Sequence, residues 1–170
     1  MKFKIVVFLL ISFILVGCSS KNWKINGIPM QDFKTTPKNY VKLIGGAGTS
    51  FLVHYLGHVV YLESNGIEWH QSGLNEVIDE PISNKDKRWS GRIGFVSQLA
   101  GGVVLKFGPW SEDFKNGYFT TGYHIGTALE VCTYPIRWDD TGDLDMIERG
   151  NGNEDLEYGI YSVSSLLLLK

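Results

Sequence analysis

Three histidines lie close together in the chain and are the first candidates for metal chemistry. They are His54, His58 and His70, in a segment rich in Val, Leu and Tyr. Such residues favour strands, and Leu56-Gly57 suits a tight turn, so we predict a β-meander over residues 50–70. A turn at Leu56-Gly57 places His54 and His58 on opposite faces of the sheet. Because a metal site needs converging ligands, we predict separate histidines and no bound metal or cofactor.

Carboxylates gather in residues 139–158, where an acidic stretch could bind calcium. The stretch does not follow the spacing of an EF-hand loop, because Ile147 stands where a third oxygen ligand is needed. A solvated acidic loop is the alternative interpretation, so calcium binding stays an open question at this point.

Cys132 and His124 are the remaining candidates for nucleophilic chemistry. Cys132 lies in an apolar, strand-like run, where a thiol packs as a small hydrophobic group. The chain has no Gly-x-Ser-x-Gly motif, and the glycine-rich residues 45–48 are not followed by the Lys-Ser/Thr of a phosphate-binding loop. We therefore predict no catalytic residues. If the chain is a hydrolase, its candidate residues are His54, His70, His124 and Cys132.

Trp89 and Trp110 stand beside charged or Pro/Gly-containing segments. Tryptophan is usually part of a core, but an exposed indole is a frequent contact for protein or glycan partners. We predict that these two side chains are exposed and belong to a binding surface.

Residues 1–17 have the pattern of a secretory signal peptide. Two lysines precede an apolar run over residues 5–16, which is too short to span a bilayer. Leu15-Val16-Gly17-Cys18 then resembles the lipobox of bacterial lipoproteins. The resemblance implies cleavage before Cys18, acylation of its thiol, and attachment to a membrane through the lipid. Ser19 is not the Asp that this class associates with the inner membrane, so the resemblance implies the outer membrane, facing the periplasm or the cell surface.

The rest of the chain divides into a lipidated N-terminus and tether, residues 18–39, and one domain, residues 40–170. Hydrophobic residues make up 44% of the chain, which is enough to form a core. The net charge is −2, and removal of the two signal-peptide lysines makes the chain more acidic. Acidic character argues against nucleic acid as a partner.

Short apolar runs separated by Gly, Asn and Pro indicate an all-β domain. We expect it to be an antiparallel sandwich or barrel with long polar loops, among them residues 72–91 and 139–158. The predicted strands are residues 40–44, 51–55, 58–63, 67–70, 92–99, 103–107, 118–125, 127–136 and 158–169.

These observations predict a membrane-anchored lipoprotein whose β-rich domain acts by binding a protein or envelope component. An accessory subunit, an inhibitor and an immunity-type factor all fit this description. The alternative is a periplasmic hydrolase.

Overall fold

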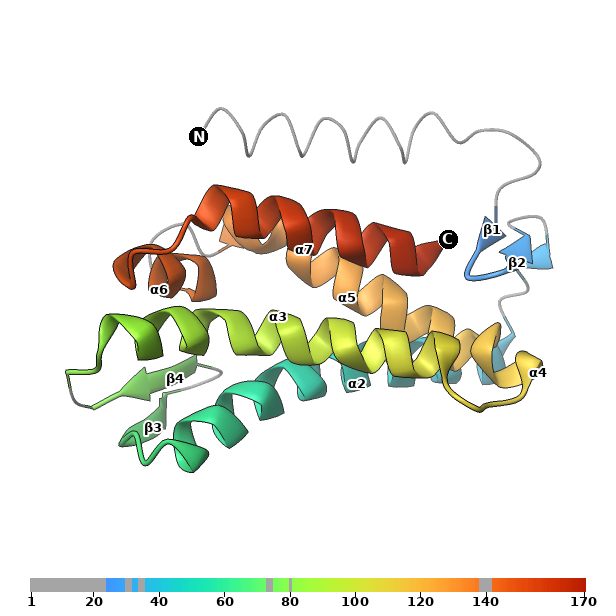
Figure 1. Cartoon of the computed structure of the whole chain (residues 1–170). Coiled ribbons are helices and arrows are strands. Elements are labelled where there is room, and N and C mark those ends of the chain that lie inside the picture. The colour runs from blue at the N-terminus through green and yellow to red at the C-terminus, as the bar shows by residue number, and fades with distance from the viewer. Residues whose placement is uncertain (1–23, 30–31, 34–35, 73–74, 80, 138–141) are drawn as a thin grey trace.

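The computed structural model describes residues 24–29, 32–33, 36–72, 75–79, 81–137 and 142–170, so the predicted signal peptide and Cys18 lie outside the described residues. The protein is mostly helical there, and the predicted all-β sandwich or barrel is wrong. Four long helices form a bundle (Figure 1), and two short helices accompany them. The long helices are α2 (Pro37–Ser64), α3 (Asn84–Phe107), α5 (Tyr118–Arg137) and α7 (Glu154–Leu169); the short ones are α4 (Glu112–Lys115) and α6 (Asp143–Arg149).

The strands form two small antiparallel hairpins at opposite ends of the bundle (Figure 1). One pairs β1 (Lys24–Ile25) with β2 (Ile28–Pro29), and the other pairs β3 (Trp69–Ser72) with β4 (Asn75–Ile78). The first hairpin turns at Asn26 and Gly27, both with positive φ, as an Asn-Gly pair between apolar residues predicts.

Helix starts are marked by capping side chains. Thr36 accepts a hydrogen bond from the Asn39 amide at the start of α2, and Pro37 occupies the first turn, where its missing N–H costs nothing. Ser83 caps α3 and Asn153 caps α7 in the same way. The predicted polar loop 72–91 therefore contains the start of α3, and the described part of the acidic stretch 139–158 forms α6 and the start of α7.

Glycines bring the helices into close contact. In α2, a Cβ on Gly46 would collide with the Phe119 carbonyl oxygen of α5. In α5, a Cβ on Gly122 would meet the Leu43 backbone. Residues 45–48, which fall between two of the predicted strands, lie inside α2, because close packing against α5 outweighs the roughly 1 kcal/mol that glycine costs in a helix.

The main apolar core lies at the end of the bundle that carries α6. Phe95 of α3 is its centre, stacking on Tyr161 with ring centroids 5.0 Å apart and meeting Tyr134 edge-on at 5.1 Å. Leu144 and Ile147 of α6 pack into the same cluster. This packing fixes α6 across the long helices.

We predict opposite effects of alanine at two glycines of α2. Gly46→Ala should lower the free energy of unfolding by about 1–3 kcal/mol, because its methyl group collides with the α5 backbone. Gly48→Ala should be neutral or raise stability by up to about 1 kcal/mol, because nothing lies within 4 Å of its Cβ position. Thermal unfolding followed by circular dichroism checks both, and equal effects would contradict the close contact.

Candidate metal centre

His54 and His58 come from one face of α2. They are four residues apart, and a helix brings such positions onto the same side, one turn apart. The exposed fraction of the side chain is 11% for His54 and 5% for His58. Gly94 of α3 lies against both rings, and a Cβ there would collide with both Nε2 atoms. The absence of a side chain at Gly94 therefore makes the space in which the imidazoles meet.

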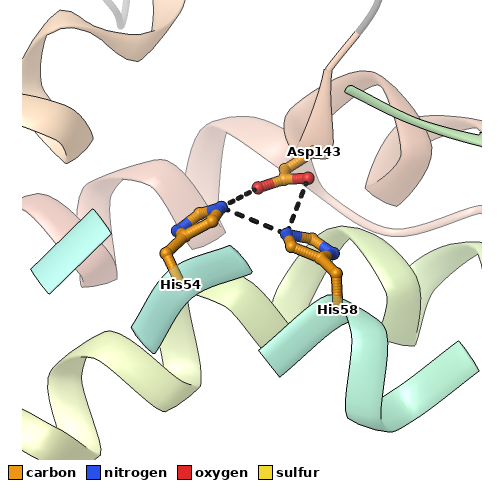
Figure 2. A group of neighbouring side chains, drawn as sticks. All are labelled: His54, His58 and Asp143. Carbon is orange, nitrogen blue, oxygen red and sulfur yellow. Dashed lines mark hydrogen bonds and ion pairs between the residues drawn. The ribbon is translucent and has the colours of Figure 1, made fainter. Parts of the chain in front are cut away.

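Asp143, the first residue of α6, brings a carboxylate to the same point (Figure 2). Its position is fixed from two sides. Its backbone amide donates to the Tyr134 hydroxyl at 2.5 Å, and its carbonyl group lies so close to Gly91 of α3 that a Cβ there would collide with it. The exposed fraction of the Asp143 side chain is 15%.

The three side chains converge closely enough to hold one metal ion. His54 Nε2 lies 3.1 Å from His58 Nε2 and 2.9 Å from Asp143 Oδ2, and His58 Nε2 lies 3.4 Å from Asp143 Oδ1 (Figure 2). Ligands bound to zinc at tetrahedral angles are separated by about 3.3 Å, as bond lengths of roughly 2.0–2.1 Å require. The spacing therefore matches that of ligands around one small cation.

A buried polar chain orients His54. Thr127 Oγ1 donates to the Tyr123 carbonyl at 3.0 Å, so Ser50 Oγ donates to Thr127 Oγ1, at 2.9 Å. Ser50 in turn accepts from Gln98 Nε2 at 2.8 Å. The direction of every bond in this chain follows from the one proton that each hydroxyl carries.

Gln98 then determines which nitrogen of His54 carries a proton. The Gln98 amide nitrogen uses its second proton on Glu130 Oε2 at 2.5 Å, so the amide oxygen, Oε1, faces His54 Nδ1 at 3.4 Å. Glu130 Oε1 lies 3.7 Å from the same nitrogen. Two acceptors favour a proton on Nδ1, so a metal ion would bind at Nε2, which is directed at the centre, in place of any proton there. This arrangement is typical of metal-binding histidines.

The charge of Asp143 fits the role of an anionic ligand. Burial alone would raise its pKa, but the adjacent His58 and His54 hold that pKa well below its usual value. The carboxylate is therefore ionised at neutral pH. Its Oδ2 atom is buried and lies 2.9 Å from His54 Nε2.

The structure separates the other candidate residues from this centre. His70 lies on β3, where its Nδ1 is 2.6 Å from Asp79 in an exposed pair. His124 is buried in α5. Cys132 lies on the same helix, about 12 Å further along its axis by helical rise, so the pair does not form a nucleophile and base. Of the hydrolase candidates, the structure brings His54 alone to the centre.

Trp89 and Trp110 are exposed, at 39% and 45%. Arg92 lies over the Trp89 ring, and Trp110 donates its Nε1 proton to the Val104 carbonyl. Their predicted role in binding a partner stays a prediction.

The predicted strand turn at Leu56-Gly57 is wrong, and it separated two residues that now form a candidate metal centre. In the helix that forms instead, Gly57 packs against Ser97 and Ile93 of α3, and His54 and His58 share a face rather than being separated by a turn. The prediction of no metal site rested on that turn, and its geometric basis is wrong. The four-residue spacing of the histidines was the available signal. Asp143 was named only within a calcium loop, whose residues 139–141 lie outside the described residues.

Comparisons with protein-family models, with curated proteins and with solved structures give no match to this chain. The interpretation of the site therefore depends on its geometry.

We predict that Gln98→Met weakens binding of Co²⁺ or Zn²⁺ by about 10–100-fold, the usual cost of losing a group that orients a metal-binding histidine. Methionine keeps the approximate volume but removes the amide that bridges His54, Ser50 and Glu130. Titration calorimetry on the purified full chain measures the affinity. Gln71→Met, on the exposed strand β3, is the control and should bind as the unaltered protein does.

Proposed function

We propose that this protein is a metal-dependent hydrolase of the bacterial cell envelope, with a zinc-class ion held by His54, His58 and Asp143. The observation that carries the proposal is the convergence of two imidazole nitrogens and one carboxylate at ligand spacing inside the bundle. Structural zinc sites usually have four protein ligands, whereas catalytic sites have three and keep a position open for water or substrate. Within the described residues this cluster supplies three ligands.

Each residue has a distinct role in this proposal. His54 and His58 provide neutral nitrogen ligands from adjacent turns of α2, and Asp143 provides the negative charge that offsets part of the charge of the ion. When bound, such an ion supplies a water molecule with a pKa near 7 and polarises the bond to be cleaved. Gln98 and Glu130 hold the ring of His54 in place. Their oxygens face the Nδ1–H group, and this increases the basicity of Nε2, the ligand nitrogen.

The histidine spacing is that of the common helical zinc protease motif, but the glutamate of that motif is missing. In His-Glu-x-x-His, a glutamate follows the first histidine and acts as general base. Here Tyr55 follows His54, and its hydroxyl bonds to Gln71 on β3. The proposal is therefore a hydrolase of the two-histidine, one-carboxylate ligand class, without that motif.

The envelope location comes from the N-terminal sequence. The lipobox-like residues 15–18 support attachment through Cys18, and an outer-membrane lipoprotein is the location we propose. A zinc-class hydrolase at this location revises the sequence-based expectation, in which binding a protein partner was the main role and hydrolysis the alternative.

We predict that Asp143→Asn, His54→Ala and His58→Ala each weaken metal binding by about 100-fold or more. The loss of a direct ligand should reduce affinity at least as much as the loss of a residue that orients a ligand. The absorption spectrum of bound Co²⁺ reports coordination, and turnover of chromogenic carboxylate and phosphate esters reports hydrolysis. Both should be lost on chelation and restored by added metal.

His70→Ala is the matched control, because His70 also lies beside an aspartate but in an exposed pair away from the centre. This variant should keep both metal binding and turnover. Circular dichroism separates loss of ligand from loss of fold, and Asp143→Asn keeps the size of the side chain. Tight metal binding without turnover of any ester would contradict the hydrolase and leave a structural ion.

A further inference from the structure

Outside the apolar cluster around Phe95, the bundle buries many polar side chains and exposes many large apolar ones. Side chains with no exposed surface at the helix contacts include Ser50, Gln98, Thr120, Thr127 and Ser165. Large apolar side chains on the same helices point outward, and these exposed residues, here called the apolar belt, include Leu52, Leu56, Val60, Val103, Val163 and Leu167. In water, the apolar residues of a helix face the core.

Helix α7 shows the exposure of large apolar side chains most clearly. Its outward positions Leu156, Ile160, Val163 and Leu167 follow the spacing of one helix face and are all more than half exposed, at 53–62%. The buried side of the helix carries Ser162 and Ser165 together with Tyr158, Tyr161 and Leu168. The buried side of α7 is therefore mixed, whereas these four outer positions are all apolar.

Helix α2 has the length that a hydrocarbon layer requires. Residues 43–62 contain no Asp, Glu, Lys or Arg and extend for about 30 Å, the thickness of a bilayer core. Among the described helices, α2 is the one long and apolar enough to cross a membrane, and 22% of its most apolar stretch is buried inside the protein. A core helix of a soluble protein would be mostly buried.

The helix contacts are of the kind found in lipid. Gly46 and Gly126 let α2 and α5 approach until backbone meets backbone, and Gly57 lets α2 approach the Ile93 carbonyl of α3. Small residues and buried polar groups are characteristic of helix contacts in membranes, where burial of apolar surface gives no advantage.

We propose that the apolar belt is embedded in the hydrocarbon layer of a phospholipid membrane, so that the folded bundle, and not only a lipid at Cys18, holds the protein there. A single protein partner fits the belt less well, because α2 and α7 carry it on opposite sides of the bundle, with α3 and α5 between them (Figure 1). A fluid apolar layer covers both sides at once.

Charged residues at one end of the bundle fit a position in which the belt lies in the hydrocarbon layer and this end lies among the lipid head groups. The exposed residues Lys38 and Lys42 lie at the start of α2, and exposed Lys170 follows the end of α7. These ends lie together in Figure 1, beside the hairpin β1–β2. Lysines at the edge of an apolar layer bind anionic lipid head groups.

Spin labelling of the full chain in phosphatidylethanolamine–phosphatidylglycerol vesicles tests this proposal. A single cysteine replaces Leu52 or Val163 in the belt, or Lys38 or Glu148 at the charged ends, in a Cys132→Ala background. Belt labels should collide several-fold more with oxygen, which concentrates in lipid, than with a water-soluble nickel chelate. Labels at Lys38 and Glu148 should show the reverse ratio.

Two outcomes overturn the proposal. Preferential collision of the belt labels with the nickel chelate would show a water-exposed domain tethered by its lipid alone. Protection from both reagents would show that protein covers the belt. If the cysteine variant at Leu52 or Val163 does not fold, the label is placed at Ile160 or Leu167 instead. None of these measurements depends on a metal ion, so the proposal stands or falls separately from the hydrolase.

Discussion

Burial of the Asp143 carboxylate beside two imidazoles is the interaction on which the rest of the site depends. An unpaired charge inside a protein is too costly to persist, so Asp143 needs the positive partners that His54 and His58 or a bound ion can provide. The same contact joins α6 to α2, two elements separated in the chain by residues 65–142. Two glycines of α3 are necessary for this contact. Gly94 leaves room for the two imidazole rings, and Gly91 lets the backbone of α6 approach α3 at Asp143.

The buried hydrogen-bond chain has a related effect on the bundle. Ser50, Gln98 and Thr127 come from α2, α3 and α5, and each contributes donors and acceptors that the others complete. In a low-dielectric interior such a chain is strong when complete and costly when broken. It therefore fixes the relative positions of three helices and the orientation of His54 together, and small helical shifts that a purely apolar contact would tolerate are disfavoured.

Local turns could be predicted from the sequence, but the helices could not. An Asn-Gly pair between apolar residues predicts a turn, and Asn26-Gly27 does form a hairpin turn, whereas Asn65-Gly66 follows the end of helix α2 rather than of a strand. Thr36-Pro37, Ser83 and Asn153 cap helices in the structure, and these residue types are common at helix starts. The prediction of strands followed Val, Ile, Tyr and paired glycines instead, which favour strands and turns in water.

The physical reason for this failure is the environment of the helices. A helix that exposes Leu, Ile and Val and buries Ser, Thr and Gly lacks the usual contrast between polar outer and apolar inner positions. The period of α7 at Leu156, Ile160, Val163 and Leu167 was therefore present in the sequence but did not mark a buried face. Asp143 could not be joined to the histidines, because their contact depends on the packing of α6 against Phe95 and Gly91.

The two proposals together place the metal centre between the middle of the apolar belt and the charged residues of α6. His54 lies just past the middle of the uncharged residues 43–62 of α2 and His58 lies in their last third, whereas Asp143 begins α6, whose other residues include Asp145, Glu148 and Arg149. Apolar surroundings on one side strengthen the interaction between the ion and its ligands, because the effective dielectric constant there is low. The charged end on the other side gives metal and water a polar approach, which a hydrolytic site needs and a position at the middle of the membrane would lack.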